Sequence, residues 1–314
     1  MDDLPDEVIL NFLSFLKIKE LIKCQVSKRL RAIVNDESLW LKLNLVRRQV
    51  RYDFIEKAAA NGCQYLSLPY CNVVGLTEKS ETSFNFKYLN VFASELSPGI
   101  KKMIQNCSSL QKLSITNLSD SDDISDLIQS ICQSGQTLQV LYLAGSDPDT
   151  PSKCFKNLFS NCVHLTEIRF RSFSSMAQIQ ALVDNLTPTI LKVDLSDNEN
   201  VYDEHVKKLV KRCNKITHLY LNSPRITNNS VHNIIEQLKA SLEKLDVSHS
   251  NLDFATLLQL KSMPALKALI FDSSKDDHAE GIENLKQQLR HISINEELID
   301  YMASPGEETL VMVS

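Results

Sequence analysis

Cysteine and histidine are the residues of this chain that could hold a metal ion or act as a nucleophile. Its 314 residues include eight cysteines and seven histidines, but no C-x-x-C pair and no His-Glu-x-x-His motif. Zinc-finger and RING domains need closely spaced pairs of ligands to close a tetrahedral zinc site. The sequence therefore predicts no metal site and no cofactor.

One cysteine has the surroundings that a nucleophilic thiolate requires. Cys213 follows Lys211 and Arg212 directly, and nearby positive charge lowers the pKa of a thiol. However, Cys213 stands three residues before a repeated apolar position, as do Cys107 and Cys162. Because this recurrence favours a small buried side chain, we expect no catalytic residue and interpret the protein as a non-enzyme.

Composition and charge argue against several other classes of protein. The closest two of the seven glycines, Gly135 and Gly145, are ten residues apart, whereas phosphate-binding loops need glycines a few residues apart. A net charge of −5 argues against general nucleic-acid binding, and the chain has no apolar run long enough to predict a membrane span. Its acidic start lacks the basic region of a signal peptide. We therefore expect a cytoplasmic or nuclear protein with free thiols.

A repeat explains the spacing of the cysteines and most of the chain. From residue 63 onward, the pattern apolar, two variable, apolar, one variable, apolar recurs at intervals of 23–28 residues, a period typical of leucine-rich repeats. Each copy predicts a short strand followed by a helix, and only stacking of copies buries their apolar sides. We expect an α/β fold, a curved solenoid of about ten repeats with a concave parallel sheet and convex helices. The copies begin at Cys63, Phe86, Leu110, Leu138, Leu165, Ile190, Ile216, Leu242, Leu266 and Leu289.

The first 45 residues lack this repeat and predict three short amphipathic helices. In the first of them, apolar residues from Val8 to Leu16 surround most of the helix. A unit of this size is near the limit of independent stability and cannot bury all of them by itself. Either the repeats or a second protein must therefore cover part of this surface.

The helical segment resembles an F-box. The similarity lies in residues 4–10 (LPDEVIL), 18–21 (IKEL), 26–29 (VSKR) and 36–40 (DESLW). Together with ten repeats, it identifies the chain as similar to the F-box/leucine-rich-repeat proteins. Within them it is most similar to the S-phase-kinase-associated type, as residues 263–269 (MPALKAL) suggest. We divide the chain into a three-helix F-box (1–46), a repeat region (47–295) and a tail (296–314).

The resemblance implies a role in ubiquitin ligation. The F-box of this family docks on a Skp adaptor, and through it on a cullin–RING ligase, while the repeats hold the protein to be ubiquitinated. Ser27 and Leu30 depart from the usual pattern, and the stretch before Val26 is one residue short, which leaves open a scaffold or inhibitor without ligase coupling. The residues expected to bind the adaptor are Leu4, Pro5, Val8, Phe12, Leu16, Ile18 and Leu21.

Strand positions that alternate with the buried ones predict the substrate surface. Arg169 and Arg171 lie on one strand, with Lys192 on the next, and like charges this close favour an acidic or phosphorylated partner. Tyrosines also suit a pleated surface without binding anything, so both interpretations stay open. The residues expected to contact substrate are Tyr88, Phe92, Tyr142, Arg169, Arg171, His218 and Tyr220.

The last nineteen residues combine acidic and apolar character. Residues 296–314 carry five acids and no base, yet include the apolar run Leu310–Val313. A purely solvated tail is seldom so apolar. We predict that it folds back onto the concave face, although a disordered end that only caps the last repeat fits the sequence equally well.

Overall fold

The computed structural model describes residues 4–77, 80–118, 124–145, 150–272 and 279–295. The chain forms two compact units, residues 1–110 and 111–314, which are considered separately below. The predicted fold-back concerns residues 296–314, which lie outside the described residues. None of the described helices combines the length and apolar character that crossing a bilayer requires.

The first unit begins with four short helices. Ser27 caps α3 by accepting a hydrogen bond from the backbone N–H of Leu30 at 3.1 Å, and Asp36 caps α4 through the N–H of Ser38. The three predicted helices are present, and a fourth single turn carries Trp40 into a buried position. The helices are α1 (Asp6–Ser14), α2 (Ile18–Lys23), α3 (Lys28–Val34) and α4 (Glu37–Trp40).

The core of this helical segment is small. Its buried side chains come from α1, α2 and α3, so the three helices hold one another in place through very few contacts. In addition, Arg29 of α3 donates from Nε to the Asp6 carboxylate at 2.7 Å, which ties α3 to the start of α1. The buried cluster consists of Ile9, Leu13, Leu21, Ile33 and Val34.

The rest of the first unit is a parallel sheet with helices. Strand β1 (Lys42–Asn44) pairs with β3 (Tyr65–Ser67), and β3 pairs with β5 (Tyr88–Val91). Strand β1 was not predicted, although Trp40, Leu43 and Leu45 repeat the apolar spacing of the later strands. The unit also contains β2 (Gln49–Arg51), β4 (Asn72–Val74), α5 (Tyr52–Ala60) and α6 (Pro98–Gln105).

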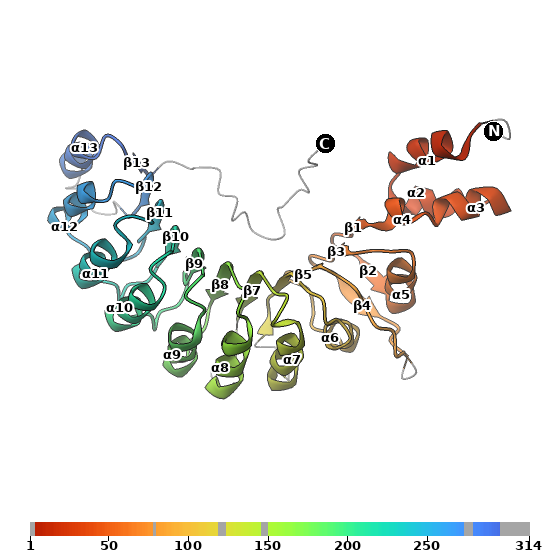
Figure 1. The fold of residues 1–314 in the computed structure, drawn as a ribbon, viewed down its shortest axis with the longest axis horizontal. Helices are drawn as coiled ribbons and strands as arrows, with labels where there is room; N and C mark the ends of the chain where they lie inside the picture. Colours follow the sequence, from red (N-terminus) through yellow and green to blue (C-terminus); the bar gives the residue numbers. More distant parts are fainter. Residues whose placement is uncertain (1–3, 78–79, 119–123, 146–149, 273–278, 296–314) are drawn as a thin grey trace. The chain divides into compact units, whose positions relative to one another are not determined.

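The second unit stacks strand–helix repeats in register. Its strands run parallel in chain order, with the helices on the outer side and the strands on the inner side (Figure 1). The strands are β6 (Lys112–Ile115), β7 (Val140–Ala144), β8 (Glu167–Arg171), β9 (Lys192–Asp194), β10 (His218–Tyr220), β11 (Lys244–Asp246), β12 (Ala268–Ile270) and β13 (Ser293–Ile294). The helices are α7 (Ile124–Ile131), η2 (Cys132–Ser134), α8 (Ser152–Asn161), α9 (Met176–Asn185), α10 (Asp203–Arg212), α11 (Asn228–Leu238), α12 (Phe254–Leu258), η3 (Gln259–Ser262) and α13 (Ala279–Gln288).

Register places equivalent apolar residues side by side and builds the predicted continuous core. Leu219 of β10 lies opposite Val193 of β9 and Leu245 of β11, and Leu245 lies opposite Leu269 of β12. All four side chains are buried. Strand and helix of one repeat therefore cover the apolar side of the next, as the sequence pattern predicts.

The small helical core generates a first prediction. Leu21→Ala should lower the free energy of unfolding by about 2–5 kcal/mol, because it opens a cavity in a cluster with few members. Phe15→Ala should change it by less than about 0.5 kcal/mol, because the Phe15 side chain is 80% exposed. Urea unfolding followed by circular dichroism measures both. Equal effects of the two changes would contradict this description of the core.

Candidate functional site

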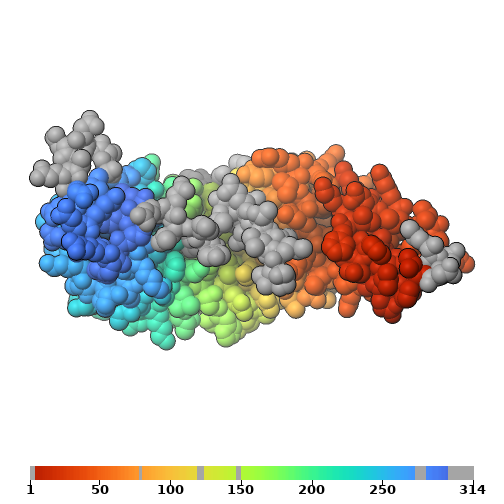
Figure 2. All heavy atoms as spheres, turned by 90° about the horizontal axis from the view of Figure 1, so that it is seen from above, coloured from red at the N-terminus to blue at the C-terminus, as the bar shows by residue number. Residues whose placement is uncertain are grey.

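The predicted adaptor surface is an apolar stripe along α1. Val8 and Phe12 are four residues apart and lie on one side of α1, with Leu4 just before the helix and Phe15 at its C-cap. All four are exposed, Phe12 at 66%. Helix α1 belongs to the red part of the molecule in Figure 2. Exposed side chains of this size are costly in water, so the stripe is a candidate contact surface.

The structure sorts the seven predicted adaptor residues into three groups. Leu4, Pro5, Val8 and Phe12 are exposed as expected, and Leu16 and Ile18 are partly buried against the helical core. The prediction for Leu21 as a contact residue is wrong, because its side chain is only 3% exposed and packs inside that core.

The two most exposed of the large apolar residues in the described part of the chain were not predicted as contacts. Phe15 and Val26 are both 80% exposed. Phe15 continues the α1 stripe one turn further and could have been found from its spacing. Val26 could not, because it lies in the turn between α2 and α3, where no helical period applies.

The two departures from the F-box pattern have structural roles in this chain. Ser27 is the N-cap of α3, and Leu30 packs against the helical core. Residues 24–27 connect α2 and α3, and both helices form on either side of this short connection. These departures therefore fit the F-box fold, and they do not by themselves argue for a scaffold without ligase coupling.

The predicted substrate residues belong to two units. Tyr88 and Phe92 belong to the first unit and are partly buried. The other five lie in or at β7, β8 and β10 of the second unit, whose strand side faces the viewer in Figure 2. The structure therefore places five of the seven predicted substrate residues in one unit: Tyr142, Arg169, Arg171, His218 and Tyr220.

Several of these strand positions are less exposed than predicted. Arg169 is only 5% exposed, and Tyr142 and Tyr220 are also buried. The guanidinium of Arg169 lies 5.8 Å from the centre of the Tyr142 ring, and the Lys244 ammonium lies 5.3 Å from that of Tyr220. Parallel strands are about 4.8 Å apart, so large side chains on neighbouring strands cover one another. Burial accordingly raises the pKa of Tyr142, although Arg171 and Arg169 oppose this shift.

Arg171 is held by carboxylates of the next repeat. Its Nε donates to Asp194 Oδ2 at 2.8 Å, and its Nη2 contacts the same oxygen. Asp197 Oδ2 lies 3.9 Å from Nη1. Burial works against the charge on Arg171, but the attraction and hydrogen bonds of Asp194 outweigh it, so the pKa of the guanidinium is raised. Asp194 itself is only 1% exposed.

Glu167 neutralises the remaining cations of this cluster. Its carboxylate lies 3.8 Å from Arg169 Nε and 3.7 Å from Lys192 Nζ. The three cations expected to repel one another therefore face three carboxylates of the same unit. The argument that their repulsion requires an acidic partner is wrong, because the chain supplies the opposite charges itself.

The cysteines three residues before the repeated apolar position are buried thiols. Cys107, Cys162 and Cys213 are all buried, and the Cys213 thiol points at the Thr187 carbonyl oxygen at 3.5 Å. Burial raises the pKa of Cys213 to about 12, although Arg212 acts in the opposite direction. Cys213 is thus a poor nucleophile. Over the described ranges, no three His, Cys, Asp or Glu side chains gather as a metal site would require.

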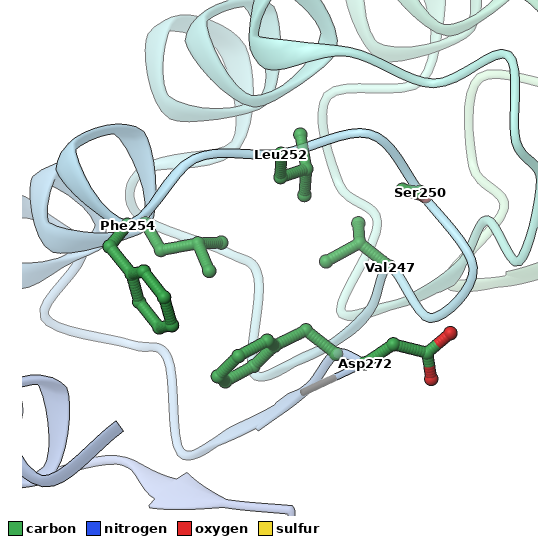
Figure 3. Close-up of a pocket in the computed structure, with 7 residues that line it drawn as sticks. Val247, Ser250, Leu252, Phe254 and Asp272 are labelled. Atoms are coloured by element: carbon green, nitrogen blue, oxygen red, sulfur yellow. The ribbon is translucent and has the colours of Figure 1, made fainter. Parts of the chain in front are cut away.

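A small pocket between β11, α12 and β12 offers space but no reactive group. Its volume is about 50 Å³, well below the 300–1,000 Å³ typical of small-molecule sites. Figure 3 shows the Asp272 carboxylate pointing away from Phe254, and Asp272 accepts a hydrogen bond from the backbone N–H of His249 at 2.7 Å. This pocket is therefore not a candidate site for a small molecule.

Comparison with known proteins agrees with these features. The family model described as the SKP2 LRR domain matches residues 53–311, and the one described as F-box-like matches residues 1–46. Among solved structures, the chain is similar to one from the crystal structure of the Rad7 and Elc1 complex in yeast. The TM-score is 0.55 at 12% identity, over 93% of this chain and 83% of that chain; at this identity the similarity shows the fold alone. The chain therefore belongs to the family of F-box proteins with SKP2-type leucine-rich repeats, as its motifs predicted.

Proposed function

We propose that this protein is the substrate-recognition subunit of a Skp adaptor–cullin–F-box ubiquitin ligase. The α1 stripe carries this proposal, because it is an exposed apolar surface on a segment that matches the F-box. The F-box would bind the adaptor, and the repeats would bind the protein to be ubiquitinated. The catalytic chemistry would belong to other subunits, in agreement with the buried thiol of Cys213. A cytoplasmic or nuclear location is part of this proposal.

We propose the strand side of β7–β10 as the substrate surface. It presents arginine and tyrosine, which are common in the energetically dominant parts of protein interfaces. An acidic or phosphorylated segment would have to replace Asp194 at Arg171. Such a partner is therefore compatible with this surface but not required by it.

Adaptor binding is tested on the stripe. Phe12→Ala with Phe15→Ala should weaken adaptor binding more than tenfold, since burying each ring contributes about 1.5–3 kcal/mol and about 1.4 kcal/mol is one decade. Leu4→Ala with Pro5→Ala should do the same. Binding is measured by calorimetry with a purified Skp-type adaptor.

Met176→Ala, at an exposed apolar residue on α9, is the matched control and should leave adaptor binding unchanged. Failure of the unaltered chain to bind any Skp-type adaptor would favour the scaffold or inhibitor without ligase coupling.

The substrate surface generates another prediction. Arg169→Ala with Arg171→Ala should reduce substrate capture at least tenfold at low salt, whereas Asp194→Asn should increase capture of an acidic substrate by removing the internal competitor.

Arg171→Ala should also cost about 1–3 kcal/mol of stability, because buried Asp194 loses its partner. Quantitative pull-down and urea unfolding measure the two effects, with Arg171→Lys as the charge-matched control. Capture that is unaffected by these changes would remove both arginines from the substrate surface.

A further inference from the structure

The turn that follows most of the strands contains a residue with a positive φ. At most of these turns the residue is small or readily adopts this conformation: φ is 59° at Asn117, 70° at Gly145 and 61° at Asp197. Glycine, asparagine and aspartate tolerate the left-handed region, whereas bulky side chains are rare there. The repeat fold itself therefore selects for small or polar side chains at this position.

Three turns carry a bulky side chain instead, at Arg47, Tyr70 and His249, and the first two of them are neighbours. Arg47 has a φ of 51° and Tyr70 a φ of 56°, 23 residues apart as the repeat requires. The backbone N–H of Arg47 donates to Pro69 at 3.0 Å, and that of Tyr70 donates to Phe92 at 2.9 Å. Neighbouring turns thus fix both residues in an unfavourable conformation. Strained residues kept in place by the surrounding structure are concentrated at ligand-binding sites.

The two side chains form an ordered surface. The Arg47 guanidinium carbon lies 5.0 Å from the centre of the Tyr70 ring, a cation–π contact. The Tyr70 ring meets Phe92 edge to face at 5.7 Å between centroids. Tyr70 is nevertheless 45% exposed, and neighbouring Val46 is 40% exposed. We name Val46, Arg47, Arg48 and Tyr70 the Arg47–Tyr70 patch.

Among the described residues of the first unit, no carboxylate forms an ion pair with the positive charges of the patch. In the described part of the first unit, the ion pairs are Arg29 with Asp6 and Arg51 with Asp53. Neither includes Arg47 or Arg48, and both of these side chains are exposed. This is the opposite of the cluster around Arg171, where carboxylates of the same unit face the cations.

From these observations we infer that the Arg47–Tyr70 patch is a second protein-docking surface, which binds an acidic segment containing an aromatic side chain from a partner protein. Carboxylates of the partner would pair with Arg47 and Arg48 through charge-assisted hydrogen bonds. Its aromatic side chain would pack on Tyr70 and Val46. This inference does not depend on the adaptor or on the surface of β7–β10.

The experiment measures binding of a fluorescent glutamate–tyrosine copolymer to the purified full chain by anisotropy at low salt. Arg47→Asn with Tyr70→Asn should weaken binding about tenfold or more. Because asparagine tolerates the left-handed region, the urea midpoint of this variant should stay unchanged or rise, so lost binding cannot be attributed to unfolding. Polyglutamate, which lacks the aromatic contact, should bind more weakly than the copolymer.

Arg51→Gln is the matched control, since it removes one positive charge at an arginine already paired with Asp53. It should leave binding unchanged. The inference is overturned if the unaltered chain does not bind the copolymer, if the double variant binds it equally well, or if Arg51→Gln weakens binding as much. Tighter binding of single-stranded oligothymidine would also overturn it, since the patch would then be a nucleic-acid surface.

Discussion

The stacking of repeats in strict register is the constraint on which the rest of this structure depends. A strand and a helix of about 25 residues cannot bury their apolar sides alone, so each repeat is stable only against its neighbours. The buried row through Val193, Leu219 and Leu245 is one consequence. The burial of Cys107, Cys162 and Cys213 is another, because a repeated position in the sequence becomes a repeated position in the core. Chemistry at the cysteines is thereby disfavoured by the fold itself.

The apolar period was enough to predict this register and the side to which each strand residue points. It was not enough to predict how deeply each side chain is buried. Arg169 and Tyr142 point to the predicted side but are buried, because side chains on strands about 4.8 Å apart cover one another according to their size. Strand β1 was not predicted, because Trp40 has two roles: it ends a helix and also begins the first copy of the apolar pattern. From the sequence, Trp40 was assigned to the helical segment alone.

Which carboxylate each cation contacts was beyond prediction for a different reason. Asp194 lies directly opposite Arg169 in the ladder, yet its carboxylate accepts hydrogen bonds from Arg171. Long side chains reach diagonal neighbours as easily as direct ones, so register alone does not decide which partner they choose. The choice matters because it turns an expected cationic surface into one on which Arg171 is already paired with Asp194.

The first unit differs from this cluster, because exposed apolar and charged side chains mark its candidate surfaces. Its helical core consists of five buried residues, too few to cover the α1 stripe as well, and the stripe is left exposed. The Arg47–Tyr70 patch is exposed because its residues lie in the turns that follow β1 and β3. An apolar stripe binds through burial, which salt weakens little, whereas a cationic patch binds through charge, which salt screens. The two surfaces of this unit are therefore suited to different partners, and their responses to ionic strength distinguish them without any substitution.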